Sequence, residues 1–312
     1  MKSRRPVGRR SPPAKNSPAS AIANPVAQTS VPYMNKFIRS KMSEDENVDH
    51  YDASYSNFAT DLYATIRKEA FGEDIGQTGW LTADEQENFI SKLDIGSGDT
   101  LLDIACGSGA PTLRIATKTG SNVVGIDIHE QGIEAARKQA QDLELAGQAK
   151  FEIVDGSKSL QFEESSFNGL ICVDAVNHLP GREAVFADWH RVLKPGGRLI
   201  FTDPITVTGP LTNEEIRVRS SIGFFLFVPS GVDERLLSNA GFEVKNVEDK
   251  TENMAFMARN WLDVRDRYSS ELINIEGEES FSGQQAFFKV AAKIAEERRL
   301  SRFAFHAVKK SE

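Results

Sequence analysis

The architecture of this chain follows from one run of residues, Leu101-Leu102-Asp103-Ile104-Ala105-Cys106-Gly107-Ser108-Gly109. An apolar run that ends in closely spaced glycines is typical of a buried strand that turns into a helix. Glycine is needed where a backbone turns tightly and lets a ligand approach without an intervening Cβ atom. We therefore predict a strand over Thr100–Ile104 and a ligand-binding turn after it.

The residues around this turn predict the kind of ligand. Thr112 stands where a dinucleotide-binding loop has its third glycine, and no GK[ST] follows, which disfavours a phosphate cradle. Asp103, at the end of the strand, can reach a bound ammonium group but would repel a pyrophosphate. Asp127 ends the next apolar run, 18 residues after Gly109, where an acid accepts both hydroxyls of a ribose. These features predict a nucleoside with a positively charged tail, which is S-adenosylmethionine.

The rest of the chain alternates apolar runs with helical patterns, which predicts a doubly wound parallel sheet. One helix is expected over Thr82–Lys92, with Thr82 as N-cap and Glu85 completing a capping box. Further strands are expected at Val123–Ile128, Lys150–Val154, Leu170–Val173, Arg198–Thr202, Phe242–Val247 and Arg302–Val308.

In order and spacing, these motifs resemble those of the class I S-adenosylmethionine-dependent methyltransferases. The resemblance covers roughly residues 98–205, with further agreement at 230–248. It is carried by the glycine turn, Gly125-Ile126-Asp127, Asp155-Gly156, Asp174-Ala175-Val176-Asn177-His178 and Leu193-Lys194-Pro195-Gly196-Gly197.

The resemblance implies an α/β, Rossmann-like, doubly wound sheet of seven strands, the last antiparallel, with helical lid insertions. It also implies cofactor-binding roles. Asp103 with Ala105, Gly107 and Gly109 would hold the methionine end, Asp127 the ribose, Ile128 the adenine face, and Asp155 with Gly156 the adenine amino group. Asp174 would contact cofactor or substrate. Ala105 occupies the position of the first glycine in the family's DxGxG pattern.

Composition divides the chain into three parts. Residues 1–42 hold nine Lys and Arg and no acid, and six of the twelve prolines lie in the first 32 residues, so we predict a disordered basic tail. The tail either directs the protein to an organelle as a presequence, or binds an anionic partner, or has no binding function. Residues 43–98 are expected to form a helical cap, and residues 99–312 the main domain with lid insertions at 205–230 and 249–300.

Charge and cysteine content exclude several classes of protein. Residues 43–312 hold 28 basic against 45 acidic residues, a poor match to nucleic acid. No apolar run is long enough to span a membrane. Cys106 and Cys172 lack the spacing of a zinc ribbon or a disulfide scaffold, so we expect no metal and a reducing, cytoplasmic location, or an organelle if the tail is a presequence. Oligomeric state stays open.

The identity of the methyl acceptor is the least constrained feature. The stretches Gly72–Ile75, Asp174-Ala175 with His178, and Phe201–Pro204 look like those of sarcosine/dimethylglycine and phosphoethanolamine N-methyltransferases, which favours a small-molecule amine. His178 is the candidate base or orienting group, with Asn177 beside it. Aromatic residues that either close over the site or simply pack are Tyr51, Tyr55, Trp80, Phe224 and Phe225.

Three rival functions remain. In the first, the enzyme methylates a carbon or oxygen atom of a lipid-like or quinone-like molecule. In the second, the chain binds the cofactor without catalysis and acts as a regulatory protein. The third and most distant is an NAD-dependent dehydrogenase.

Overall fold

The computed structural model describes residues 60–311, so the predictions for the tail and for Tyr51 and Tyr55 lie outside the described residues. The strands are β1 Thr100–Ile104, β2 Asn122–Asp127, β3 Ala149–Ile153, β4 Phe167–Cys172, β5 Leu193–Val207, β6 Val228–Pro229, β7 Phe242–Asp249 and β8 Leu300–Lys309. The helices are α2 Asp61–Phe71, α3 Ala83–Leu93, α4 Ala110–Thr119, α5 Glu130–Asp142, the 3₁₀ turn η1 Val176–His178, α6 Arg182–Val192, α7 Asn213–Arg219, α8 Val232–Asn239, α9 Thr251–Arg267, α10 Ser269–Glu276 and α11 Glu278–Glu296.

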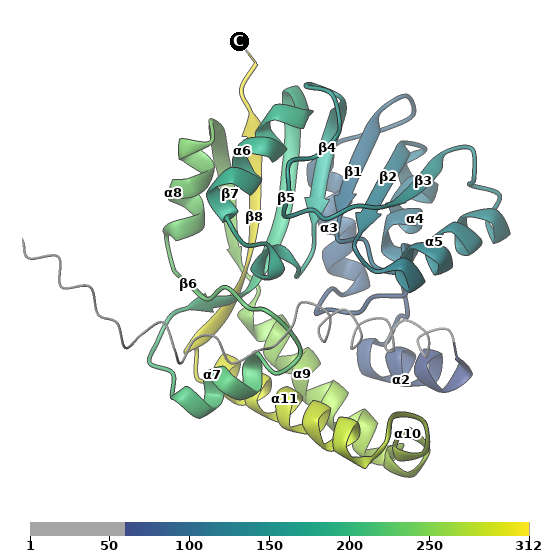
Figure 1. Cartoon of the computed structure of the whole chain (residues 1–312), viewed down its shortest axis with the longest axis vertical. Helices are drawn as coiled ribbons and strands as arrows, with labels where there is room; N and C mark the ends of the chain where they lie inside the picture. The colour runs from purple at the N-terminus through teal and green to yellow at the C-terminus, as the bar shows by residue number, and fades with distance from the viewer. Residues whose placement is uncertain (1–59, 312) are drawn as a thin grey trace, which may run out of the picture. The chain divides into compact units, whose positions relative to one another are not determined.

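The strands form one twisted sheet in the order β3-β2-β1-β4-β5-β8-β7 (Figure 1). Strands β1 to β5 are parallel, and β8 runs antiparallel to both of its neighbours. The predicted doubly wound sheet with an antiparallel last strand is confirmed. The two-residue strand β6 pairs with the end of β5 and was not expected.

The apolar side chains of the strands lie in two cores, one on each face of the sheet, because successive residues of a strand face opposite sides. Leu101 packs with α3, α4 and α5 on one face, and Leu102 with α6 and α8 on the other. Ile171 and Cys172 on β4 divide in the same way. Both faces of the sheet are therefore covered, as a parallel sheet requires.

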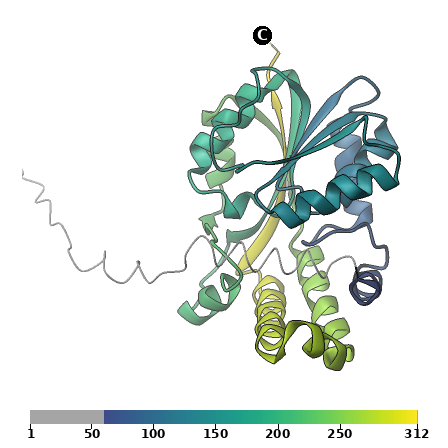
Figure 2. The same ribbon diagram turned by 45° about the vertical axis from the view of Figure 1, so that its right-hand side comes forward.

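A separate group of helices lies beyond one end of the sheet (Figure 2). It consists of α2, α9, α10 and α11, with α7 beside them, and its core holds Trp261, Phe281 and Phe287. The expected insertion at 249–300 is thus α9 to α11, and the one at 205–230 holds α7 and β6. Of the two described helices in the expected cap, α2 packs on α9, whereas α3 packs on the sheet.

The topology places the predicted ligand-binding residues at one edge. The carboxyl ends of β1, β2 and β4 meet there, since Asp103 pairs in register with Gly125 and Ile171. Ligands of open α/β sheets bind at this edge. Among the described residues, no helix is long and apolar enough to cross a membrane.

Candidate active site

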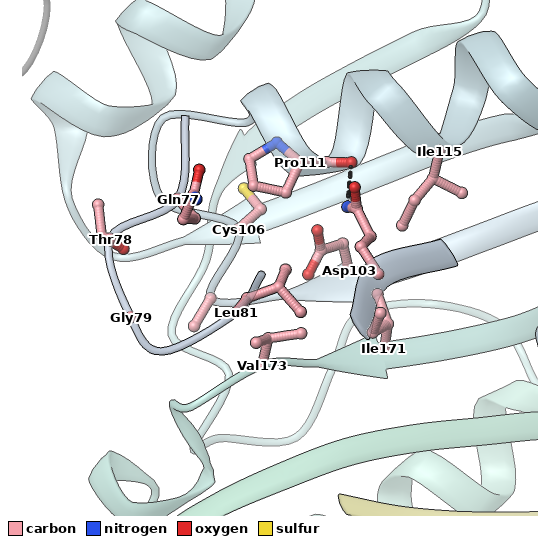
Figure 3. A pocket seen from close by; sticks show the side chains of 12 residues that line it. Gln77, Thr78, Gly79, Leu81, Asp103, Cys106, Pro111, Ile115, Ile171 and Val173 are labelled. Atoms are coloured by element: carbon pink, nitrogen blue, oxygen red, sulfur yellow. Dashed lines mark hydrogen bonds between the residues drawn. The ribbon is translucent and has the colours of Figure 1, made fainter. Parts of the chain in front are cut away.

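A cavity opens at the carboxyl end of β1 (Figure 3). Asp103, Ala105 and Cys106 form its floor, with Ile171 and Val173 at the end of β4. The opposite wall is Pro111 and Ile115 of α4 together with the loop before α3, namely Gln77, Thr78, Gly79 and Leu81. The cavity therefore contains the first part of the predicted glycine turn.

The glycine turn has the backbone that the sequence predicts. Gly107 and Gly109 have φ angles of 55° and 77°, and Ala105 has 59°. Ala105 thus keeps the left-handed conformation that favours glycine. The backbone strain of this conformation raises the free energy of the folded chain, and other contacts must offset it. At Gly109 an added Cβ would lie 2.6 Å from Cβ of Ala136 and 2.9 Å from the Phe151 ring, so a side chain has no room there.

Asp103 is a buried carboxyl that bonds Thr112 on α4. Its Oδ2 accepts a hydrogen bond from the Thr112 hydroxyl. Burial, reinforced by the charge of Asp127, raises the pKa of Asp103 to about 7, although the Thr112 bond opposes this shift. Thr112, which sequence reasoning used only to exclude a dinucleotide, is therefore part of the site.

Asp127 ends β2 and faces the glycine turn. Its Oδ2 accepts from the Gly107 backbone N–H at 2.9 Å. Its Oδ1 accepts from the backbone N–H of His129 at 3.0 Å, and Nδ1 of the same histidine lies at 2.7 Å. His129 thus orients the acid predicted to bind the ribose, and only the short Asp-x-His spacing signals this.

The residues predicted to contact the adenine follow β2 and β3, and none of them lines the cavity. Ile128 is 45% exposed, as a residue that covers a ligand face would be before binding. Asp155 is also exposed, and its Oδ1 accepts from the Ser157 N–H at 2.8 Å. Gly156 is buried so closely that an added Cβ would lie 2.8 Å from Ile104.

Asp174 is placed differently from the residues that line the cavity. Arg302 Nε donates to its Oδ1 at 2.7 Å, and the Trp80 backbone N–H donates to its Oδ2 at 2.8 Å. The Thr202 hydroxyl also donates to Oδ1, at 2.7 Å. These partners occupy both oxygens, so the side chain fits an indirect role better than the predicted direct contact.

His178 and Asn177 lie together in η1, directly after β4. His178 Nδ1 is 2.8 Å from the Phe224 carbonyl, and its ring meets that of Phe225 edge to face at 4.7 Å. Burial lowers the pKa of His178 to about 4, and the nearby Arg219 charge contributes. Asn177 is fully buried, and neither atom of its amide has a hydrogen-bond partner within residues 60–311.

The predicted lid aromatics separate into two groups. Phe224 is 48% exposed, and Phe225 packs on His178, so both lie beside the candidate catalytic residues. Trp80 is buried and stacks on Phe287 of α11, with the Arg219 guanidinium 5.7 Å from its ring centre. Its side chain thus anchors the helical group, and its backbone contacts Asp174.

Residues 95–223 match the family described as "Methyltransferase domain". These residues form a methyltransferase domain. The prediction of an S-adenosylmethionine-dependent methyltransferase is therefore confirmed.

Relatives of this methyltransferase differ in the acceptor that their names give. It is 29% identical over 221 residues to 27-O-demethylrifamycin SV methyltransferase of Amycolatopsis mediterranei, covering 67% of this chain and 79% of that protein. It is 30% identical over 230 residues to sterol 24-C-methyltransferase ERG6 of Saccharomyces cerevisiae, covering 68% of this chain and 59% of that one. For phosphoethanolamine N-methyltransferase 3 of Arabidopsis thaliana, identity is 28% over 218 residues, covering 69% of this chain and 42% of the other.

The methyltransferase fold extends beyond the matched domain. The cyclopropane synthase MmaA2 from Mycobacterium tuberculosis superposes with a TM-score of 0.72 at 20% identity, covering 84% of this chain and 98% of that chain. The helices around the domain therefore belong to a shared fold. Acceptor choice has to be argued from the site itself.

Proposed function

We propose that this methyltransferase transfers the methyl group of S-adenosylmethionine to an amine nitrogen of a small molecule. The observation that carries the choice of acceptor is His178, a neutral imidazole whose ring is fixed by the Phe224 carbonyl. It lies at the end of β4, beside the edge of the sheet where the cofactor residues gather.

The cofactor fits the residues present. The tight glycine turn brings backbone close to a ligand, Asp103 suits its ammonium group, and Asp127 suits its ribose hydroxyls. The turn is packed from behind, since a Cβ on Gly125 would lie 2.6 Å from the Phe151 ring and 2.9 Å from Sγ of Cys106. When bound, S-adenosylmethionine would supply a methyl carbon on its sulfonium, which an aligned nucleophile attacks in line as S-adenosylhomocysteine leaves.

The protonation state of His178 favours an amine over a hydroxyl. A carbonyl oxygen can only accept, so Nδ1 carries the proton and the lone pair of the neutral ring is on Nε2. With a pKa of about 4, His178 is a weak base for the hydroxyl of an alcohol. An unprotonated amine already has the lone pair that attacks the methyl group. Nε2 then has only to accept a hydrogen bond from the amine N–H and so orient the amine.

Arg219 supports the same choice through its charge. Its guanidinium lies 5.2 Å from the Phe225 ring centre and 4.6 Å from that of Phe287, and its charge acts on His178. A buried cation disfavours a second positive charge nearby. The charge of Arg219 thereby favours the neutral, nucleophilic form of an amine bound beside His178.

A second candidate is a carbon acceptor in an apolar molecule. The exposed Phe224 ring and the Phe225 ring give the acceptor side an aromatic surface. An alkene carbon, like a neutral amine, needs no base before it accepts the methyl group.

Replacing His178 with Asn should lower kcat by about 10- to 100-fold, in line with the loss of one positioned acid–base group. The wild-type profile of kcat against pH should show no ionisation of His178 between pH 6 and 8, because its pKa of about 4 keeps it neutral there. Steady-state kinetics from pH 5 to 9 test both statements. A wild-type ionisation near pH 6.5 that disappears in His178→Asn would contradict this role.

The acceptor class is tested by transfer of labelled methyl from S-adenosylmethionine into a small-molecule extract, separated into aqueous and organic phases. Asp127→Ala is the control that lacks the ribose contact. Label in a cationic, water-soluble product supports the amine. Label confined to the organic phase supports the carbon acceptor and overturns the amine.

We also propose a reducing, cytoplasmic location, which the buried free thiols Cys106 and Cys172 support. Nucleic acid is an unfavourable partner for a chain with a net charge of -8.

A further inference from the structure

The segment 74–80, which we call the cover segment, forms part of the wall of the cofactor cavity. Gln77, Thr78 and Gly79 line the cavity opposite Asp103 (Figure 3). At its start, Gly76 packs on the first residue of α4, because an added Cβ would lie 2.4 Å from Cβ of Ala110. The cover segment is therefore fitted to the helix that follows the glycine turn.

Hydrogen bonds within the segment and one from Arg67 of α2 shape the first half of the cover segment. Asp74 Oδ1 accepts from the Gly76 N–H at 2.9 Å and from Arg67 Nε at 2.9 Å. Gln77 Oε1 accepts from the Ile75 N–H at 2.8 Å. These bonds fix the local shape of the segment but do not join it to the sheet.

The second half is joined to the sheet through Asp174. The Trp80 N–H donates to Asp174 Oδ2 at 2.8 Å. Gly79 passes so close that an added Cβ would lie 2.7 Å from the same oxygen. Asp174 itself has a φ of 53°, a strained conformation for a residue with a side chain, which persists because its partners hold it.

Arg302 of β8 is the residue that holds Asp174. Its Nε and Nη2 bond the two carboxylate oxygens at 2.7 and 3.2 Å, and its Nη1 bonds Glu85 Oε1 of α3 at 2.7 Å. Arg302 is fully buried, and the side chains of Asp174 and Glu85 are 4% exposed. Solvent does not weaken these charge-assisted bonds.

We propose that Arg302 is a positioning residue for cofactor retention: through Asp174 it holds the cover segment in the cavity wall and slows cofactor release. The inference rests on the proposed cofactor. Arg302 does not line the cavity, so its effect passes through the Trp80 N–H and the close approach of Gly79. One hydrogen bond to a charged group is worth about a 10- to 100-fold change in an equilibrium or rate.

Gly79→Ala tests the proposal without removing a buried charge. The new Cβ meets Asp174 Oδ2 and separates the cover segment from the carboxylate, while Arg302 keeps both of its acidic partners. Gly147→Ala is the matched control, because a Cβ there meets nothing within 4 Å.

The measurement is the dissociation rate of S-adenosylhomocysteine, followed by stopped flow on the whole chain. We expect Gly79→Ala to raise this rate by about 10- to 100-fold and to raise KM for the cofactor more than it lowers kcat. Gly147→Ala should match the wild type. An unchanged dissociation rate in folded Gly79→Ala overturns the proposal.

Arg302→Lys supplies a second test, since lysine keeps the charge but loses the fork that bonds both oxygens. Dissociation should be faster than in the wild type, and unchanged dissociation contradicts the role of Arg302. If Arg302→Lys does not fold, Asp174→Asn replaces it, because an amide keeps the shape and weakens both contacts. Failure of the wild type to bind S-adenosylhomocysteine would overturn the proposed cofactor as well, whereas normal binding with unchanged rates overturns only the positioning role.

Discussion

The affinity of the wild type for S-adenosylhomocysteine should fall about tenfold for each unit of pH below 7, reaching about 100-fold at pH 5. The cause is Asp103, whose pKa is raised to about 7 mainly by burial. The ammonium group of the ligand favours the ionised carboxylate. Below pH 7 a proton must therefore leave Asp103 for each ligand bound, which sets the slope. Above pH 7 the affinity should level off.

Two variants separate this effect from others. Asp103→Asn should bind about 10- to 100-fold more weakly at pH 7.5 and lose the slope between pH 5 and 7. Thr112→Val removes the hydrogen bond that lowers the pKa of Asp103, so the onset of weak binding should move to higher pH. Isothermal titration calorimetry across pH 5 to 8 gives both quantities.

The ligand provides a matched control. 5′-Methylthioadenosine keeps the nucleoside and the sulfur but lacks the amino acid, so its affinity should not follow the ionisation of Asp103. If both ligands lose affinity equally below pH 7, the proton is taken up elsewhere and the assignment of Asp103 is wrong.

The fold could be predicted because its signals are local. Leu101 and Leu102 send side chains to opposite cores, and the same apolar runs recur at each central strand. Thr82 caps α3 as expected, accepting from the Glu85 N–H. The predicted capping box is only half present, because the Glu85 carboxylate bonds Arg302 and Asn253 instead of the Thr82 backbone.

The contacts that complete the site could not be predicted, because their partners are distant in sequence. Asp174 and Arg302 are 128 residues apart, and neither local pattern indicates the other. From its local sequence Asp174 is predicted to contact a ligand, yet in the structure its carboxylate oxygens bond protein groups. The roles of His129 and Thr112 were easier to predict from the sequence. Each lies close in sequence to the acid that it bonds, His129 to Asp127 and Thr112 to Asp103.

Arg182→Met should lower the free energy of unfolding by about 3–5 kcal/mol, the typical cost of removing one partner from a buried ion pair. Arg182 begins α6, and its Nη1 lies 2.7 Å from Asp203 Oδ2 on β5 and 2.8 Å from Asp233 Oδ1 on α8. The three residues are at most 3% exposed. Without the guanidinium, two carboxyl groups remain buried together. Arg217→Met, at an exposed pair on α7, should change stability by less than about 0.5 kcal/mol.

The same cluster should make stability depend on pH with a definite sign. Burial, reinforced by the charge of Asp203, raises the pKa of Asp233 to about 7, against the opposing effect of Arg182. The folded chain therefore binds more protons at Asp233 than the unfolded chain does between about pH 4 and 7. Stability from this group is greatest at the acid end of that window and declines by up to about 1.4 kcal/mol per pH unit as pH rises to 7.

Asp233→Asn separates the charge effect from the packing effect. An amide of the same shape removes the second negative charge, so the variant should gain stability relative to the wild type as pH rises from 5 to 8. In the double variant Arg182→Met with Asp233→Asn, part of the loss caused by Arg182→Met should be recovered, because one buried charge is gone. Urea unfolding at pH 5 and pH 8 measures all four proteins. Strictly additive changes at both pH values would mean that the two side chains do not interact, against the 2.8 Å contact between them.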